Sequence, residues 1–427
     1  MKKMYYQNVK GTQDYLPNAE VVRREITRTL EDVFIQYGCR PLETPILNYT
    51  ELLASKYGGG AEILEEMYTL TDRGERDLSL RYDLTIPFAK VVAMNPTLRM
   101  PFRRYEIGKV FRDGPIKTGR FREFTQCDVD IVGVESQIAE AELMIMALDA
   151  CNKLDLQVTI QYNNRKLLTG MLEVFGAEDE KINKTVLILD KLEKVGLEAV
   201  IAELHEQGLS NTTIHSIRQF LTDKNNTSFN YFEPYAKQNK QVSQGLEEWR
   251  ELESYLEFLD VKKHCVFNPF LARGLEIYTG TVYEIFLTDQ SIKSSIGSGG
   301  RYDNAIGGLI GTDENFSTVG ISFGLDVIYT ALNASGTNLK ENSNVDYYII
   351  PIGMPKEALL VATDLRNKCY KVEVEMNNKR IGKALEKANK EKIRNVIMIG
   401  ENEVSNNQIK IKDMVSGGER MKSFLFS

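Results

Sequence analysis

Apolar residues recur at helical spacing in several parts of the chain. In the run 20–38 they include Ile26, Leu30 and Val33, which follow Pro17 and precede Gly38. Residues three or four positions apart share one helical face, so this pattern predicts an amphipathic helix that ends at Gly38. Similar patterns predict a helix over 136–154. A further helix is expected from one apolar stripe, made of Leu246, Trp249, Leu252, Leu256 and Leu259.

Shorter apolar and alternating runs predict β-strands. Two of them, 102–112 and 121–132, flank a short loop that contains Gly114-Pro115, which predicts an antiparallel hairpin. An extended segment is expected around Thr44-Pro45-Ile46, and the spacing in the glycine-rich run 297–303 by itself indicates a turn. Further strands are expected within 274–287 and at 345–352, 371–375, 395–399 and 408–412, with helices between the first three of this last group.

These patterns divide the chain into three parts and a linker. Domains commonly have about 150 residues, so 427 residues suggest about three of them. Strand patterns are sparse in 168–245, which predicts a helical insertion into a first domain made of 1–167 and 246–332. The segment 333–344 has almost no large apolar residue and is expected to be a linker. The remaining part, 345–427, is expected to be a small α/β domain.

The composition is that of a globular protein. Charged residues make up 26% and hydrophobic residues 42%, which excludes a disordered chain, a collagen and a small disulfide scaffold. No run approaches the roughly 20 apolar residues of a membrane helix, and the N-terminus lacks the apolar core of a secretory signal. The five cysteines are scattered without a CxxC pair, and there are three histidines. We therefore expect a reducing cytoplasm, no zinc and no other metal held by the protein alone.

Charge is distributed unevenly along the chain. The net charge is −7, yet 345–427 carries 15 Lys+Arg and 11 Asp+Glu, or +4, while the rest carries 38 and 49, or −11. Within the basic part, four cations spaced three, four and three apart lie on one face of a helix expected near 380–392. They are Arg380, Lys383, Lys387 and Lys390. Such a stripe is either a solvated face or a surface for nucleic-acid phosphates.

The second strand of the hairpin carries a polar face. Alternation places Phe124, Gln126, Asp128 and Asp130 on one side and mostly apolar residues on the other. This strand is either an edge strand that faces water, which the pattern alone favours, or the wall of a polar cleft. Cations near the loop suit a ligand with both charges, such as an amino acid with a nucleotide phosphate, because arginine can hold two oxygens. These cations are Arg112, Lys117, Arg120 and Arg122.

Several motifs, taken in order, resemble those of the class II histidyl-tRNA synthetases. The run 10–14 is similar to the N-terminal signature of this family, and the helix and strand that end at Thr44-Pro45 are similar to class motif 1. Phe111-Arg112 together with 120–130 resembles motif 2, and 320–326 resembles motif 3. The runs 273–278 and 299–303 resemble two peptides peculiar to the histidine enzymes, although Arg273-Gly274 alone is more typical of an ordinary strand start.

The resemblance implies an α+β fold: a class II synthetase-like antiparallel sheet of six or more strands flanked by helices, the helical insertion, and a C-terminal α/β anticodon-binding domain. It implies ATP-dependent ligation of L-histidine to tRNA(His) through a histidyl-adenylate, with Mg²⁺ accompanying ATP, in a cytoplasmic homodimer formed through motif 1. The basic stripe would then face the anticodon stem-loop. Two alternatives remain open: a non-catalytic paralogue that regulates ATP phosphoribosyltransferase, and a tRNA sensor without aminoacylation.

The resemblance also assigns roles to single residues. Arg273 would lie across the reacting carboxylate and the α-phosphate as the main catalytic cation, and Arg112 would hold the same region. Arg120 and Arg122 would join these two in binding ATP. The α-amino group of histidine would be held by Asp83, Thr85 and Gln126. The imidazole would be bound by Asp130, Tyr278 and Tyr302, with Ile277 beside them.

These residue types suit the chemistry. A neutral imidazole offers one donor and one acceptor, a charged one offers two donors, and a carboxylate with a phenol can satisfy either. Attack of a carboxylate on the α-phosphate of ATP develops charge on equatorial oxygens, which guanidinium groups and Mg²⁺ stabilise without a protein base.

The chain departs from the family pattern at two positions. Ile277 stands where the family usually has an aromatic residue, which should change packing more than chemistry. Motif 3 ends in Asp326-Val327, whereas the family usually has an acidic residue followed by the arginine that binds the γ-phosphate of ATP. Either Arg120 or Arg122 replaces this cation, or Val327 is simply a core residue.

Overall fold

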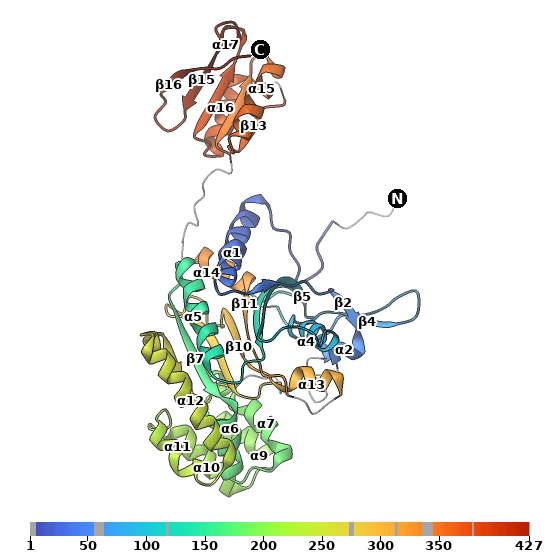
Figure 1. Ribbon diagram of the computed structural model, residues 1–427, viewed down its shortest axis with the longest axis vertical. Helices are drawn as coiled ribbons and strands as arrows, with labels where there is room; N and C mark the ends of the chain where they lie inside the picture. Colours follow the sequence, from blue (N-terminus) through green and yellow to red (C-terminus); the bar gives the residue numbers. More distant parts are fainter. Residues whose placement is uncertain are drawn as a thin grey trace. The chain divides into compact units, whose positions relative to one another are not determined.

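An eight-stranded sheet forms the centre of the larger of the two units into which the chain divides, Met1–Thr337 and Asn338–Ser427. The computed structural model describes residues 6–54, 64–116, 119–272, 277–311, 315–334, 345–377 and 380–426. The strand order is β1-β5-β6-β11-β10-β9-β7-β8 (Figure 1). The strands are β1 (Arg40–Pro41), β5 (Phe102–Phe111), β6 (Glu123–Val132), β7 (Val158–Asn164), β8 (Cys265–Phe267), β9 (Thr281–Leu287), β10 (Gly297–Arg301) and β11 (Thr318–Gly324).

The pairing of these strands confirms the antiparallel sheet expected from the sequence. Every pair from β5 through β6, β11, β10 and β9 to β7 is antiparallel, and β1 and β8 join the two ends in parallel. The predicted hairpin is the β5–β6 pair, which runs from Phe102 opposite Val132 to Phe111 opposite Glu123. Because β6 lies between β5 and β11, the prediction of an edge strand that faces water is wrong.

The turn predicted for the glycine-rich run is also wrong, because Gly297–Arg301 forms strand β10 between β9 and β11. The local preference of glycine for turns is outweighed here by the close approach of the neighbouring strands. A Cβ atom on Gly299 would collide with the carbonyl oxygen of Gly320 and would lie 2.8 Å from the Tyr283 ring. Glycine inside a strand often marks such an approach.

Three helices pack on one face of the sheet: α1 (Pro17–Gln36), α5 (Ile138–Lys153) and α14 (Leu325–Ala334). Of these, α1 packs against both of the others. Helix α1 buries Ile26, Leu30 and Val33 completely, as its apolar spacing predicts. Gly38, just beyond the helix, has a φ of +75°, a conformation that favours glycine at a helix end. These helices cover the apolar face of β6 and leave its polar face on the other side of the sheet.

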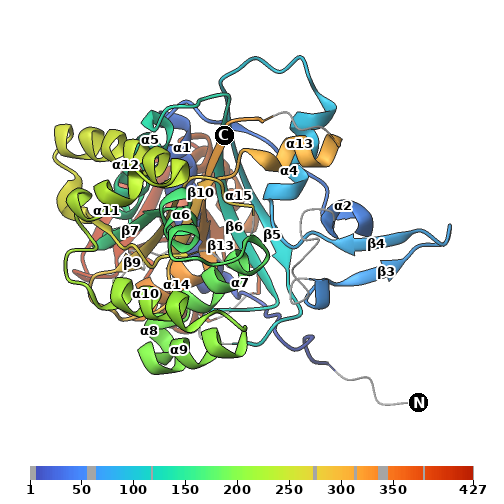
Figure 2. The same ribbon diagram turned by 90° about the horizontal axis from the view of Figure 1, so that it is seen from below.

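Between β7 and β8 the chain forms a run of helices (Figures 1 and 2). The expected insertion at 168–245 lies within this run. The last helix buries Leu246, Trp249, Leu252 and Leu256, but Leu259 follows its end and is 48% exposed, so the predicted stripe is one residue shorter. The helices are α6 (Arg165–Val174), α7 (Asp179–Leu189), α8 (Leu192–Val195), α9 (Leu197–Glu206), α10 (Asn211–Thr222), α11 (Phe229–Ala236) and α12 (Lys240–Phe258), followed by the 3₁₀ helix η2 (Lys262–His264).

A small three-stranded sheet with the order β2-β4-β3 completes the larger unit (Figure 2). Its strands are β2 (Leu47–Tyr49), β3 (Thr69–Thr71) and β4 (Asp77–Leu80). Other helices of this unit include α2 (Thr50–Ala54), α4 (Thr85–Met94) and α13 (Asn304–Ile310), and α13 packs against α4. None of the helices that the structure describes is long and apolar enough to cross a bilayer.

The C-terminal unit is a separate mixed-sheet α/β unit, as predicted. Its strand order is β13-β12-β14-β15-β16, and separate apolar clusters that include Ile397 and Tyr348 form its core. Strand β16 was not predicted, because each of its residues is exposed and no apolar alternation marks it. The elements are β12 (Tyr347–Pro351), α15 (Pro355–Asn367), β13 (Val372–Val374), α16 (Ile381–Lys390), β14 (Asn395–Ile399), α17 (Glu401–Ser405), β15 (Gln408–Asp413) and β16 (Glu419–Ser423).

Candidate active site

Polar residues of neighbouring strands meet on the face of the sheet that α1, α5 and α14 leave open. Asp130 on β6 lies opposite Arg104 on β5 and opposite Gly320 on β11. One step along the strands, Asp128 lies between Glu106 and Ser322. A Cβ atom on Gly320 would collide with Asp130 Oδ1, so glycine gives the carboxylate its place across the sheet.

A small cavity of about 40 Å³ lies on this face. It is lined by Thr85, Asp128, Asp130, Ile277, Tyr278, Ser298, Gly299, Gly300, Tyr302, Gly320, Ile321 and Ser322. The lining brings together most of the residues predicted to bind histidine. Gln126 reaches it indirectly, because its Nε2 donates to Ser322 Oγ at 2.9 Å.

Asp83 has a structural task beside the cavity. Its Oδ1 accepts hydrogen bonds from the backbone N–H groups of Thr85 and Ile86, both at 3.0 Å, at the start of α4. These bonds satisfy donors that a helix N-terminus otherwise leaves unpaired. Asp83 is not among the residues that line the cavity, whereas Thr85 is.

A chain of alternating charges leads from the cavity into the protein. Tyr302 donates to Asp130 Oδ1, and Arg104 Nη2 lies 2.6 Å from Asp130 Oδ2. Arg104 is fully buried, and its Nη1 lies 3.6 Å from Glu106 Oε2. Glu106 in turn accepts from Arg81 Nη1 at 2.8 Å and from the hydroxyl of Thr44 at 2.8 Å. Partners of opposite charge make such burial tolerable, because an isolated buried charge is very costly.

Burial shifts the protonation equilibria of this site. It raises the pKa of Asp128 to about 7; Arg104 lowers the pKa and the neighbouring Asp130 raises it. Burial also raises the pKa of Asp130, against Arg104 and the hydrogen bond from Tyr302. The pKa of Tyr302 is raised mainly by burial, so its phenol stays protonated and acts as a donor.

Sequence reasoning assigned no role to Arg104, Glu106 or Asp128. Asp128 was placed on the polar strand face but not in a site. The signal for the other two was available, because Arg104 and Glu106 alternate on β5 and the hairpin register sets them opposite Asp130 and Asp128. Arg301, inside the glycine-rich motif, was also missed. It forms a buried bidentate pair with Glu140 of α5, at 2.6 and 2.8 Å.

The cations expected to bind ATP differ in their surroundings. Arg112 lies over two rings, 4.2 Å from the centre of Tyr82 and 5.1 Å from that of Phe124. Arg122 is 2.6 Å from Asp113 Oδ1, an ion pair within the same segment. Arg120 is more exposed, and its ionic contact with Glu66 is long, at 3.9 Å. Arg273, the expected catalytic cation, and Lys117 lie outside the described residues.

The two residues that end motif 3 have different environments. Asp326 is buried and accepts from Tyr15, from Arg23 Nη1 at 2.6 Å and from the backbone of Thr125 at 2.8 Å, so it ties α14 to α1 and β6. Val327 is only partly buried. Its methyl groups lie 3.6 and 3.7 Å from the place of a Cβ on Gly119, in the loop of the hairpin.

The basic stripe of the C-terminal unit is partly engaged within the protein. Lys383 and Lys390 are exposed on α16. Lys387 pairs with Glu373, and its Nζ lies 4.9 Å from the centre of the Tyr348 ring. Arg380 precedes the first residue of α16 as its N-cap. Two of the four predicted cations thus project from the helix into solvent.

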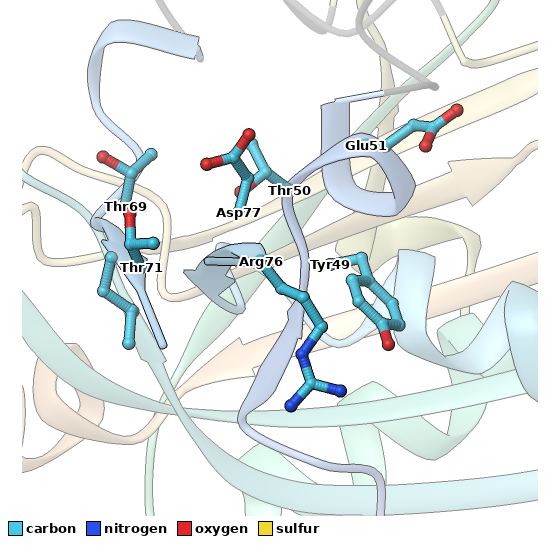
Figure 3. A pocket seen from close by; sticks show the side chains of 8 residues that line it. Tyr49, Thr50, Glu51, Thr69, Thr71, Arg76 and Asp77 are labelled. Atoms are coloured by element: carbon cyan, nitrogen blue, oxygen red, sulfur yellow. The ribbon is translucent and has the colours of Figure 1, made fainter. Parts of the chain in front are cut away.

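A larger cavity, of about 700 Å³, lies away from these residues on the small sheet β2-β4-β3 (Figure 3). Figure 3 shows Arg76 and Tyr49 beside one another in it, with Asp77 and the threonines on the other side. It contains none of the residues predicted to bind histidine or ATP.

Comparison with known proteins covers the whole chain. The sequence pattern of the histidyl-tRNA synthetase family matches residues 11–328, and that of an anticodon binding domain matches 346–424. The chain is 58% identical over 426 residues to histidine–tRNA ligase 2 of Shouchella clausii, covering 100% of both chains. It is 54% identical over 425 residues to histidine–tRNA ligase 1 of Bacillus cereus, covering 97% of both.

Among solved structures, the histidyl-tRNA synthetase of Nostoc sp. PCC 7120 superimposes with a TM-score of 0.84 at 28% identity, covering 99% of this chain and 97% of that one. This agreement confirms the class II synthetase-like fold that the motifs implied. The family pattern spans more than half of the chain, and the curated relatives match it from end to end. The chain therefore belongs to the histidyl-tRNA synthetase family.

Proposed function

We propose that this chain ligates L-histidine to tRNA(His) with ATP, through a histidyl-adenylate. The observation that carries the proposal is the polar cavity around Asp130 and Tyr302, in a chain that matches histidine–tRNA ligases over its full length. The test is pyrophosphate exchange into ATP that depends on histidine. Exchange supports the ligase, whereas its absence with intact tRNA binding would favour the tRNA sensor. Its absence without tRNA binding would favour the regulatory paralogue.

In this function the cavity binds the amino acid. Asp130 and Tyr302 bind the imidazole together with Tyr278, and Ile277 packs beside the ring. Asp83, Thr85 and Gln126 hold the α-ammonium group, and Asp83 also sets the position of Thr85 at the start of α4. The hydrogen bond from Tyr302 to Asp130 supports this arrangement, because it fixes an acceptor and a phenol side by side.

ATP lies on the hairpin side of the cavity in this proposal. Arg112 and Arg273 hold the α-phosphate and the reacting carboxylate, and Mg²⁺ bound to ATP neutralises further phosphate charge. The position of Arg112 over Tyr82 and Phe124 supports its role, because a guanidinium held between rings presents its donors in a fixed direction.

Arg120 is the better candidate for the γ-phosphate than Arg122. Arg122 already pairs with Asp113 at 2.6 Å, whereas the ion pair of Arg120 with Glu66 is long and partly exposed. Arg120 also follows Gly119, whose backbone lies against Val327. The hairpin loop therefore reaches the position where the family usually has its motif 3 arginine.

Val327→Arg is expected to lower the KM for ATP several-fold. A charge-assisted hydrogen bond contributes roughly 1.5–3 kcal/mol, so a full contact would raise the affinity for ATP by about 10- to 150-fold, which is the upper limit of the expected change. Steady-state exchange kinetics at varied ATP measure it. Val327→Met adds length without charge and should leave KM unchanged. An unchanged KM in Val327→Arg as well would mean that the γ-phosphate lies out of reach of position 327.

The exposed lysines of α16 are proposed to contact the anticodon stem-loop. Lys383→Glu/Lys390→Glu should weaken tRNA binding and flatten its salt dependence, by up to about one unit of log–log slope for each phosphate that is no longer neutralised. Filter binding at several salt concentrations measures this slope. Lys356→Glu/Lys422→Glu changes the net charge of the same unit equally, away from α16. An equal weakening in both variants would reject a specific role for this helix.

A cytoplasmic homodimer completes the proposal. Its interface is expected to involve α1 and the strand at Thr44-Pro45. Exposed apolar side chains beside this strand support the interface, because such a patch commonly marks a contact between proteins. The exposed fractions are 43% for Ile46, 44% for Leu47, 56% for Tyr49 and 39% for Leu70 of the adjoining strand β3. A stable twofold interface usually buries more than about 1,200 Å². Sedimentation velocity at micromolar concentration should show a dimer, and a monomer would contradict it.

A further inference from the structure

Buried polar atoms without a hydrogen bond gather at one place in the part of the chain that the structure describes. Of the six such side-chain atoms, five belong to Arg104, Gln126, Asp128 and Asp130, which line the small cavity or contact residues that do. Native proteins leave few buried polar atoms unpaired, and each one calls for an explanation. Asp128 and Asp130 line the cavity itself, so a molecule bound there can supply partners for their oxygens.

The two carboxylates of the cavity differ in what they already bind. Asp130 Oδ1 accepts from Tyr302, and Asp130 Oδ2 lies 2.6 Å from Arg104 Nη2, close enough to balance the charge. Asp128 Oδ1 has no hydrogen-bond partner among the described residues, and Asp128 is 4% exposed. Asp128 Oδ1 is therefore an available acceptor beside Asp130.

Most of the charged groups around Asp128 are acidic, so its carboxylate is expected to bind a hydrogen-bond donor of the ligand. Across β5 it faces Glu106 and, diagonally, Arg104, which is shared between Glu106 and Asp130. On its own strand its ionisable neighbour is Asp130, and before α4 stands Asp83, which also raises the pKa of Asp128. From the loops beside β10 and β9, Tyr302 and Tyr278 line the same cavity. Ser322 of β11 lies opposite Asp128 and lowers its pKa. Among these groups Arg104 is the single cation.

The shape of the cavity indicates which part of the substrate meets Asp128. Asp128 lines it together with Ile277, Tyr278 and Tyr302, the residues that suit a flat ring. Of the residues expected to hold the α-ammonium group, Thr85 lines the cavity, whereas Gln126 and Asp83 do not. A ring N–H is therefore the donor that the cavity brings to Asp128.

We propose that Asp128 is a second imidazole-binding carboxylate, whose Oδ1 accepts a hydrogen bond from a ring N–H of bound histidine, and that the complex holds one proton shared between the ring and Asp128. The proposal rests on the function proposed above. It adds a residue that sets the protonation state in which histidine is bound.

The shared proton makes binding dependent on pH in both directions. Burial raises the pKa of Asp128 to about 7, and free imidazole titrates near 6.5. Above pH 7 neither free partner holds the proton, so binding takes one up and affinity falls as pH rises. Below about pH 6.5 both free partners are protonated, so binding releases one and affinity falls as pH drops. Affinity for histidine therefore peaks near pH 7.

Titration calorimetry with histidine alone, at pH 8 in buffers of different ionisation enthalpy, measures the proton directly. The wild type should take up most of one proton for each histidine bound. Asp128→Asn should take up almost none, and its KM for histidine should lose the rise above pH 7, because an amide cannot hold the proton. Asp149→Asn, an exposed aspartate of α5 that accepts from Tyr37, should behave like the wild type.

The outcomes separate this proposal from the proposed function. No proton uptake by the wild type at pH 8 would overturn it without any variant, and would indicate that Asp128 meets the α-ammonium group, which is already protonated. Uptake that persists in a folded Asp128→Asn variant would place the proton on another group and would also overturn it. If the wild type shows no exchange that depends on histidine, the ligase function itself fails.

Discussion

Replacing Asp130 by alanine is expected to lower kcat/KM for histidine in pyrophosphate exchange by roughly 10⁴-fold. Losses of this size are seen when one partner of a buried hydrogen bond between a binding site and its substrate is missing. The variant removes the acceptor of Tyr302 and leaves Arg104, which is fully buried, without its 2.6 Å partner. Exchange kinetics at varied histidine measure the decrease.

The Asp130→Ala result is specific only if the rest of the site survives. Binding of ATP alone should stay within a few-fold of the wild type, because Arg112 and Arg120 lie on the hairpin side. Asp149→Ala, on the exposed side of α5, provides a matched removal of one aspartate. A normal KM for histidine in Asp130→Ala would show that the pocket is assigned to the wrong residues.

Glu140→Gln is expected to destabilise the larger unit by about 3–5 kcal/mol, because it leaves Arg301 as a buried charge without its main counter-ion. The side chains of Arg301 and Glu140 are 3% and 0% exposed. Glu198 and Arg218 form a matched control pair, which is also bidentate, with N···O distances of 2.8 and 2.7 Å. This pair lies at the surface, where the side chain of Glu198 is 76% exposed and that of Arg218 is 39% exposed. Glu198→Gln should leave stability almost unchanged, because water screens exposed pairs.

Urea unfolding followed by tryptophan fluorescence suits this comparison. Trp249 is the single tryptophan of the chain and is buried in the larger unit, so its emission follows that unit. A chain of two units need not unfold in one step, and a probe confined to one of them avoids that difficulty. Equal shifts in Glu140→Gln and Glu198→Gln would show that burial does not decide the strength of these pairs.

The elements that could be predicted from the sequence are those whose type follows from the spacing of apolar residues within the element itself. Helix α1 and the β5–β6 hairpin follow from spacing alone, because the buried face and the turn are both local features. The surroundings of the polar face of β6 depend on residues that are distant in the sequence. Alternation shows that Asp128 and Asp130 share a face, but not whether that face meets water or a neighbouring strand.

The parts that could not be predicted depend on partners distant in sequence. The strand at Gly297–Arg301 exists because β9 and β11 close on it, a requirement that outweighs the local preference of glycine. Lys387 fits its helical stripe, yet Glu373 of a different element takes up its charge. Arg104 differs from these, because the register of the predicted hairpin already sets it opposite Asp130. The order of motifs, rather than spacing, identified most of the candidate site.

The row of buried charges from Asp130 through Arg104 and Glu106 to Arg81 bears on attempts to evolve a heat-resistant form of this protein. Replacing a whole buried ionic group by well-packed apolar residues is often neutral or stabilising. A screen that rewards thermal resistance alone would therefore accept apolar residues at all four positions of this row and discard the pocket without any sign of damage. Stabilising changes of this kind commonly cost activity. Selection for heat resistance in this protein should therefore also require that each variant still binds histidine.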